Sequence, residues 1–316
     1  MSVNKINYDI IICVGWNDIL IVKKTIKYLR LNLKGDIIYI IINRFYFNQF
    51  STQFLKDYRV VLIDEDELIP GVNYKSLRLY LQKNRPQFPT GWYYQQFLKM
   101  GFSDSRYAKD YYLIWDADTL PLSKLEFVNE GQLLFTQKKE YHKEYFDTIE
   151  TIFHIRKNSD FSFIAEHMLI KTTIMKEIIN KLSESEERCW PFSLINHIQP
   201  QAYLGFSEFE TYGTYVNHYY PGLYKPRMLN TWRNAGSVFG RNVKDEELKA
   251  LAIDLDIVSL ESWNGKFFPQ NIVSRIMEFY VKFLRYKYLR SEKLHMSPRK
   301  ILKMLVNHSK IITVHQ

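Results

Sequence analysis

The sequence predicts an α/β fold in which helices flank a mostly parallel sheet. Short apolar runs rich in β-branched residues alternate with amphipathic stretches through the first half of the chain. These runs are continuously apolar and do not alternate with polar residues, which is typical of parallel strands covered on both faces. A composition of 46% hydrophobic and 24% charged residues is that of a globular chain and excludes a disordered or fibrous one.

The first half of the chain has a βαβ rhythm. Four apolar runs predict strands at residues 9–14, 36–42, 59–63 and 111–115. Apolar residues at helical spacing predict helices at residues 18–31, 74–81 and 92–100. This rhythm favours a doubly wound sheet, in which ligands bind beyond the carboxyl ends of the strands. We therefore expect the chemistry to lie just after Val14, Ile63 and Trp115.

The second half of the chain is less regular. It predicts strands at residues 132–136 and 166–170, a helix at 173–182, an acidic surface stretch at 184–187, and helices at about 271–289 and 297–307. The length of 316 residues fits one α/β domain over residues 1–265 and a basic helical C-terminal extension over 266–316. The sequence lacks a glycine-rich phosphate loop of the GxGxxG or GxxxxGKS/T type, which argues against a Rossmann dehydrogenase or a P-loop enzyme.

The positive charge is concentrated in the C-terminal extension. Residues 266–316 contain eleven Lys and Arg against two Glu, which equals the formal net charge of +9 for the whole chain. Basic amphipathic helices are typical contacts for an anionic membrane surface, where each Lys or Arg contributes about 1 kcal/mol. The extension therefore predicts either a membrane-surface contact or a helical face that packs on the domain with its charges solvated.

Three further observations bear on the cellular compartment. The two cysteines, Cys13 and Cys189, are too few and too far apart for a disulfide framework or a cysteine-based metal site. The apolar runs are much shorter than the roughly 20 residues that span a bilayer, and the first residues lack the apolar core of a secretory signal. We therefore expect a cytoplasmic protein, peripheral at the inner face of the cytoplasmic membrane if the extension binds lipid.

The sharpest local feature is an acidic pair that follows the strand predicted at residues 111–115. Asp116 and Asp118 stand two positions apart where the backbone leaves the sheet. Clustered carboxylates repel each other and are costly to desolvate unless a cation joins them. Mg²⁺ and Mn²⁺ accept such oxygen ligands and leave positions free for phosphate oxygens. The pair predicts a divalent metal site, and the alternative is a polar strand end at which Asp118 caps a turn.

This segment resembles the GT-A class of nucleotide-sugar glycosyltransferases. The resemblance rests on the apolar strand that ends in the DxD motif after an N-terminal strand–helix unit, and on the preceding string GWYYQQFLK at residues 91–99. Residues 92–121 are similar to a bacterial family of DxD-bearing glycosyltransferase-like proteins that is largely uncharacterised. The resemblance implies a GT-A-like (Rossmann-like) sheet, a nucleotide-sugar donor such as a UDP-sugar, and Mn²⁺ or Mg²⁺.

The resemblance also implies roles for single residues. Asp118 would bind the metal ion, and Asp116 would bind the ion or the donor ribose. A histidine late in the domain completes the metal shell in many GT-A enzymes, and His218 is the candidate here, with His167 as its competitor. Donor contacts are expected from Gly15, Trp16, Asp18, Asp64, Gln95, Gln96 and Lys99. Asp18 fits equally well as the N-cap of its helix, and Lys99 as part of a solvated helix face.

A catalytic base for an inverting transfer is expected in the acidic and aromatic segment at residues 206–212. Glu208 and Glu210 lie two residues apart, so on a helix they diverge by about 200° and only one of them can face the cleft. An inverting enzyme needs a carboxylate that takes the proton from the acceptor hydroxyl. We choose Glu208 over Glu210, and either one can instead be a surface carboxylate or a partner of Arg227 or Arg233.

The function expected from the sequence is a metal-dependent glycosyltransferase that builds a glycan or glycolipid, such as a capsule or lipopolysaccharide intermediate. Two other interpretations stay open. A haloacid-dehalogenase-like phosphatase would use Asp116 as nucleophile and Asp118 as acid and base, but Thr119 falls one position early for the DxDxT/V motif. A non-enzymatic module would bind nucleic acid or a membrane through the extension, where residues 285–290 interleave basic and aromatic side chains. No RNA-binding signature accompanies them, so a nucleic-acid partner is not expected.

Overall fold

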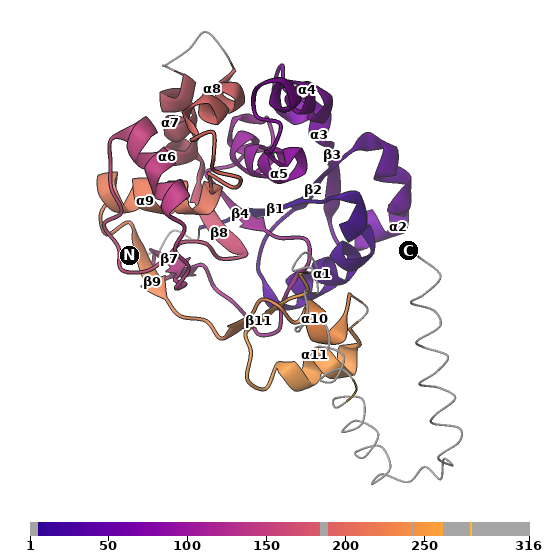
Figure 1. Cartoon of the computed structure of the whole chain (residues 1–316). Coiled ribbons are helices and arrows are strands. Elements are labelled where there is room, and N and C mark those ends of the chain that lie inside the picture. The colour runs from indigo at the N-terminus through magenta and orange to yellow at the C-terminus, as the bar shows by residue number, and fades with distance from the viewer. Residues whose placement is uncertain (1–5, 184–188, 242, 262–278, 280–316) are drawn as a thin grey trace, which may run out of the picture.

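A five-stranded sheet forms the centre of the molecule, in the order β3-β2-β1-β4-β8 (Figure 1). The computed structural model describes residues 6–183, 189–241, 243–261 and 279. The strands of the central sheet are β1 Asp9–Cys13, β2 Ile38–Ile42, β3 Val60–Asp64, β4 Tyr111–Trp115 and β8 His167–Lys171. The first four run parallel to one another, and β8 is antiparallel to β4. Every residue of β1 and β2 is buried, as their continuous apolar sequences require.

Helices cover both faces of this sheet. In Figure 1, α4 and α5 lie on one side of the strands and α1 lies on the other. The helices are α1 Ile19–Asn32, α2 Thr52–Asp57, α3 Glu65–Leu68, α4 Tyr74–Asn84, α5 Thr90–Gly101, α6 Lys143–Phe153, α7 Thr172–Ser183, α8 Trp190–His197, α9 Glu208–Tyr219, α10 Gly236–Phe239 and α11 Asp245–Leu251. Short 3₁₀ segments lie at Trp16–Asp18, Arg44–Gln49 and Phe102–Asp104.

Two three-stranded sheets complete the fold. β5 Thr119–Pro121 pairs antiparallel with β11 Ile257–Ser259, and β10 Thr231–Trp232 runs parallel to β11. β7 Gln132–Thr136 lies between β6 Val128–Asn129 and β9 Tyr224–Arg227. The hydroxyls of Thr119 and Ser259, 140 positions apart in the chain, lie 2.7 Å from each other. The pairing of β5 with β11 therefore brings the end of the described chain next to the acidic pair.

The fold class expected from the sequence, an α/β fold with a mostly parallel sheet flanked by helices, is confirmed. The predicted strands and helices of residues 9–182 are all present, with small shifts at their ends. The helices α6 and α8 and the pairing of β5 with β11 were not predicted. The acidic stretch at 184–187, the domain boundary after residue 265 and the helices of the basic extension lie outside the described residues, residue 279 excepted. None of the described helices is both long and apolar enough to cross a membrane.

Candidate active site

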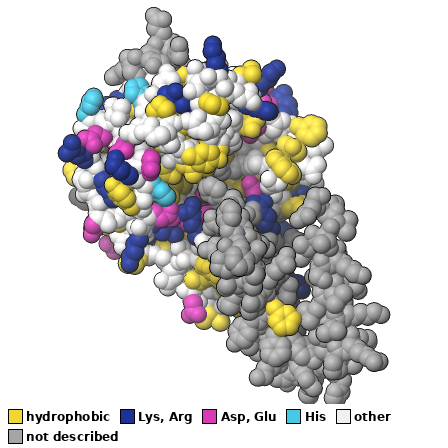
Figure 2. All heavy atoms as spheres, viewed as in Figure 1, with side chains coloured by type: hydrophobic (Ala, Val, Ile, Leu, Met, Phe, Trp, Pro, Cys, Tyr) yellow, Lys and Arg dark blue, Asp and Glu magenta, His cyan; other side chains and the backbone are white. Residues whose placement is uncertain are grey.

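A cavity of about 630 Å³ opens beyond the carboxyl ends of β1 and β4. Two of the three segments in which chemistry was expected line it, namely those that follow Val14 and Trp115. Seven carboxylates and three Lys or Arg side chains face the cavity, so its wall is acidic overall. Figure 2 shows acidic and basic side chains close to one another near the middle of the face that it displays. Such a wall suits a ligand that brings positive charge with it.

Asp116 and Asp118 line the cavity from the turn between β4 and β5. The backbone of this turn is held from two sides. Asp116 N donates to Glu166 O at 2.9 Å, and Leu260 N donates to Asp118 O at 2.8 Å. The side chain of Asp118 makes no hydrogen bond within the described part of the chain, so it does not cap the turn. The structure thus brings the two carboxylates to the same cavity, as the DxD interpretation requires.

The carboxyl group of Asp118 lies in an environment that disfavours its charge. Burial raises the pKa of Asp118 to about 7. Three neighbouring carboxylates add to the shift, and the Arg241 guanidinium opposes it; the carboxylates are those of Asp116, Asp18 and Glu261. A buried carboxyl group surrounded by like charge is stabilised in its ionised form when a cation comes close. The arrangement therefore fits a positive ion at Asp118.

The donor set decides how such an ion would be held. Within the described residues, no three His, Cys, Asp or Glu side chains form a group that could bind a metal ion. Mg²⁺ is commonly bound by one or two carboxylates, with substrate phosphates and water in the remaining positions. Asp116 and Asp118 match this pattern, in which the substrate completes the site. The residues present thus fit a metal ion that binds together with a phosphate-bearing ligand.

The pKa of Asp118 makes a prediction for the metal-free protein. Between about pH 4 and pH 7 the native state holds a proton that the unfolded chain, with an ordinary carboxyl pKa of 3.8, has released. The free energy of unfolding should therefore fall as the pH rises through this range. We expect its difference between the wild type and Asp118→Asn, measured by urea unfolding in EDTA, to change by a few kcal/mol between pH 4 and pH 8. A difference that does not depend on pH would contradict this environment for Asp118.

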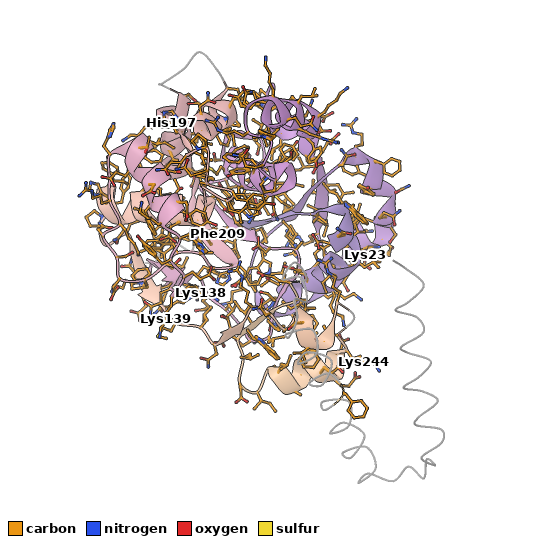
Figure 3. The ribbon with its side chains drawn as sticks, viewed as in Figure 1. Lys23, Lys138, Lys139, His197, Phe209 and Lys244 are labelled. Carbon is orange, nitrogen blue, oxygen red and sulfur yellow. The ribbon has the colours of Figure 1, made fainter. Side chains whose placement is uncertain are left out.

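A buried lysine joins Asp116 to Glu208. The Nζ of Lys99, on α5, lies 2.7 Å from Asp116 Oδ1 and 2.7 Å from Glu208 Oε1. It also lies 4.7 Å from the centroid of the Phe209 ring, which Figure 3 labels near the centre of the molecule. Burial alone would lower the pKa of Lys99, but the charges of the two carboxylates raise it, so the ammonium stays charged. The alternative of a solvated helix face is wrong for Lys99, which instead positions both carboxylates.

Helix α9 separates the two candidate bases. It begins at the N-cap Ser207, whose hydroxyl accepts a hydrogen bond from Glu210 N at 3.2 Å. Glu208 lines the cavity. Glu210 is fully buried, and its Oε2 accepts hydrogen bonds from Ser162 Oγ at 2.8 Å and Phe163 N at 3.0 Å. Glu210 thus fastens α9 to the segment before β8, and only Glu208 of the pair faces the cavity.

Three more of the expected donor residues line the cavity, each in a different manner. Gln95 lies on the same face of α5 as Lys99, and its side chain makes no hydrogen bond with a described residue. Gln96 is buried, and its Oε1 accepts a hydrogen bond from Glu208 N at 3.0 Å. Asp18 makes no capping hydrogen bond to α1, and its Oδ1 lies 2.7 Å from Arg241 Nη1. Asp18 therefore stands at the N-cap position of α1 without capping the helix, and its side chain lines the cavity.

Gly15, Trp16 and Asp64 do not line the cavity. Gly15 and Trp16 immediately precede its rim, and Trp16 is 68% exposed. Asp64 ends β3 and caps α3 by accepting a hydrogen bond from Asp66 N at 3.3 Å, while its Oδ2 lies 3.0 Å from Arg44 Nε. Asp64 is thus engaged by Arg44 and α3 at the neighbouring strand and does not face the cavity.

The structure does not bring His218 to the acidic pair. His218 is exposed near the C-terminal end of α9, and Glu208 begins that helix, about 15 Å away at 1.5 Å per residue. His167 is buried, stacks on Trp115 with ring centroids 4.9 Å apart, and has a pKa well below its ordinary value because of burial. Neither histidine therefore lies where it could complete a metal site at Asp116 and Asp118. A rigid helix separates His218 from the cavity, and the core encloses His167.

A second charged group on the wall had no signal in the sequence. Arg233 lies between two carboxylates, with its Nη1 2.5 Å from Glu140 Oε1 and its Nε 2.6 Å from Glu261 Oε1. Glu166 Oε2 lies 3.2 Å from the Nζ of Lys138, which Figure 3 labels. These partners replace the pairing of Arg233 with Glu208 or Glu210 that the sequence left open. Arg233 meets Glu261 through the pairing of β10 with β11, a contact between distant parts of the chain.

A family model decides where this chain belongs among known proteins. It matches residues 18–228, about two thirds of the chain, and is described as a family of unknown function (DUF6492). The chain belongs to this family. The matched part of the DUF6492 protein contains Lys99, the acidic pair and Glu208, whereas Arg233 and Glu261 follow it. None of the curated proteins matches the sequence.

Solved structures similar to this DUF6492 protein include glycosyltransferases. Mouse xyloside xylosyltransferase 1 in its apo form is 11% identical with a TM-score of 0.45, covering 84% of this chain and 100% of its own. The galactosyltransferase LgtC with donor and acceptor sugar analogues is 12% identical with a TM-score of 0.42, covering 92% and 98%. The apo form of the glycosyltransferase GlyE of Streptococcus pneumoniae TIGR4 is 15% identical with a TM-score of 0.40, covering 90% and 64%. Identities and TM-scores this low say nothing of the function of this chain.

Proposed function

We propose that this DUF6492 protein is a metal-dependent glycosyltransferase that moves a monosaccharide from a nucleotide sugar, most simply a UDP-sugar, to a glycan or glycolipid. The observation that carries the proposal is the carboxyl group of Asp118, which faces an acidic cavity beside Asp116 with its pKa raised to about 7. A carboxylate in such a place needs a cation, and two carboxylates leave positions on the ion for diphosphate oxygens. The DxD resemblance supports the same ligand.

Four charged side chains that line the cavity have a part in the proposed transfer. Asp116 and Asp118 hold the ion, which when bound neutralises the charge that develops on the departing diphosphate. Lys99 fixes Asp116 and Glu208 relative to each other, since it contacts both. Glu208 orients the acceptor hydroxyl and takes its proton if the reaction inverts configuration.

The remaining polar groups are proposed to bind the donor. The amide of Gln95 lines the cavity and makes no hydrogen bond with another described residue, and Asp18 with Arg241 lies beyond the carboxyl end of β1. We place the acceptor at the inner face of the cytoplasmic membrane, because residues 266–316 carry the net positive charge. Flotation of the protein with anionic liposomes at low salt, and its loss at high salt, would support that placement; no flotation at low salt would contradict it.

A thermal-shift panel tests the proposed function. The panel contains UDP-, GDP- and dTDP-sugars, UMP as a ligand without a diphosphate, and p-nitrophenyl phosphate, each with Mn²⁺ or with EDTA. We expect at least one nucleotide sugar to raise the melting temperature with Mn²⁺ but not with EDTA, by about 2.7 kcal/mol of stability at a ligand concentration of 100 Kd. UMP should give less, because it lacks the second phosphate that would share the ion.

Two outcomes of this panel would contradict the proposal. If no nucleotide sugar shifts the melting curve under any condition, the transferase interpretation fails. If the protein releases phosphate from p-nitrophenyl phosphate and binds no nucleotide sugar, Asp116 and Asp118 serve a phosphatase instead.

A further inference from the structure

Three of the four aromatic side chains that line the cavity lie together. Trp92, His142 and Tyr145 all line it, and we call them the aromatic wall. The rings of Trp92 and Tyr145 are stacked at 26° with centroids 6.4 Å apart, and the His142 ring lies 4.8 Å from that of Tyr145. Trp92 comes from α5 and Tyr145 from α6, so the wall joins two helices. The aromatic wall and the acidic pair line the same cavity.

The aromatic wall lies away from the acidic pair along α5. Trp92 precedes Lys99 by seven residues, or two helical turns, which places it on the same side of the helix about 10 Å away. Lys99 contacts Asp116, so this helix face carries both an aromatic side chain and a contact to the acidic pair. Gln95 lies between them with its side-chain amide unpaired among the described residues. The aromatic wall thus lies two helical turns from the acidic pair within the same cavity, and Glu140 lies beside it, 3.6 Å from His142 Nε2.

Polar groups lie beside the aromatic wall. Burial raises the pKa of the Tyr145 phenol, and the charges of Glu208 and Glu140 raise it further, so both carboxylates lie near this ring. Glu208 also faces the cavity between the aromatic wall and Asp116. A site of this kind offers a flat apolar surface with hydrogen-bond acceptors at its edge.

We propose that the aromatic wall is the acceptor subsite and binds a pyranose ring. A pyranose has faces of C–H groups and an edge of hydroxyls, so one face would lie against the half-buried indole of Trp92, on which the buried Tyr145 ring stacks, while a hydroxyl points to Glu208. This inference rests on the proposed function, since that proposal assigns Asp116, Asp118 and their ion to the donor diphosphate. In the transfer, the acceptor oxygen bonds to the donor's anomeric carbon, the bond from that carbon to the diphosphate breaks, and Glu208 receives the hydroxyl proton if configuration inverts. The acceptor is therefore a sugar and not a peptide or a lipid alcohol.

Saturation-transfer NMR on the full chain tests the aromatic wall. The probes are the methyl α- and β-pyranosides of glucose, galactose and mannose. We expect at least one of them to receive saturation at its ring C–H protons from the wild type. Trp92→Leu, which keeps an apolar side chain but removes the indole, should weaken this binding by about fivefold or more. The stabilisation by nucleotide sugar and Mn²⁺ should stay unchanged in Trp92→Leu.

Phe192→Leu is the matched control. Phe192 is also half-buried and aromatic, it packs on Tyr80 outside the cavity, and its replacement should leave pyranoside binding as in the wild type. If Trp92→Leu melts early, Trp92→Phe is measured in its place and should bind the pyranosides more weakly than the wild type.

The outcomes separate the two proposals. Pyranoside binding that is equal in the wild type and the Trp92 variants overturns the aromatic wall as a subsite. A wild type that binds a nucleotide sugar but no pyranoside also overturns it and leaves the proposed function standing. A wild type that binds pyranosides through Trp92 but no nucleotide sugar supports the wall as a sugar site and overturns the transferase function.

Discussion

Replacing Lys99 with methionine should destabilise the protein by about 3 kcal/mol and lower its melting temperature by about 6 to 12 °C. The Nζ of Lys99 lies 2.7 Å from carboxylate oxygens of both Asp116 and Glu208, and its side chain is 5% exposed. Methionine keeps the length and apolar stem of the side chain but leaves two neighbouring carboxylates without their cation. Removing one member of a buried ionic group is costly because the remaining charges stay buried. Thermal melts followed by circular dichroism measure the effect.

A double-mutant cycle shows whether the loss comes from the stranded carboxylates. Glu208→Gln in the Lys99→Met background should recover part of the lost stability, with a coupling of more than about 1 kcal/mol between the two sites. Lys143→Met is the control, since Lys143 is 71% exposed and pairs with Asp147 on the same helix. Such a surface pair contributes at most about 0.5 kcal/mol. Equal effects of Lys99→Met and Lys143→Met would contradict the structural role given to Lys99.

The same variant should impair donor binding indirectly. The ammonium of Lys99 already contacts two carboxylates and the Phe209 ring, so it is not directed at a bound donor. Loss of Lys99 frees Asp116 to move and brings it into repulsion with Glu208. We therefore attribute to Lys99 the positioning of the acidic pair, and not direct contact with the diphosphate.

The central sheet was predictable from the sequence because each of its strands can be recognised from its own residues. β1, β2 and β4 are buried on both faces, so each is a short, continuous apolar run, which is typical of a strand in a parallel sheet. Helix α6 was not predicted, although its sequence KEYFDTIETIF has the spacing of an amphipathic helix and buries Tyr145, Ile149 and Phe153. The strands β5 and β11 are three residues each and become recognisable only through their pairing.

The acidic pair was predictable from the sequence, and the rest of the wall was not. Asp116 and Asp118 directly follow the apolar strand β4. Ligands of open α/β sheets bind beyond the carboxyl ends of the strands, so the position of the pair was expected on both grounds. Glu261 and Arg233 reach the cavity through the pairing of β10 and β11 with β5, which no short-range pattern encodes. His218 was expected there because the resemblance implies a metal-binding histidine late in the domain, but His218 lies near the C-terminal end of helix α9. Helical geometry, which separated Glu208 from Glu210 correctly, also excludes His218.

Asp118→Asn should change the protein in two opposite directions. Without metal at pH 8, we expect the variant to be more stable than the wild type by about 2 to 4 kcal/mol, since the amide carries no charge to bury. Its replacement also removes repulsion with Asp116, Asp18 and Glu261. With Mn²⁺ and the nucleotide sugar that binds the wild type, the variant should show no ligand-dependent rise in melting temperature, because one of the two metal ligands is lost. Thermal melts in EDTA, in Mn²⁺ alone, and in Mn²⁺ with the nucleotide sugar measure both effects.

The opposite signs are what distinguish a binding residue from a structural one. A structural carboxylate such as Glu210 loses hydrogen bonds when it is replaced, so its removal lowers stability under every condition. Asp118 makes no hydrogen bond among the described residues, and burial and three neighbouring carboxylates outweigh the Arg241 guanidinium, so we expect a bound cation to stabilise its charge. Asp57→Asn, at an exposed aspartate of α2, should change neither quantity. If Asp118→Asn is less stable than the wild type in EDTA, or still responds to Mn²⁺ with the nucleotide sugar, the carboxyl group of Asp118 is not held in place for a cation.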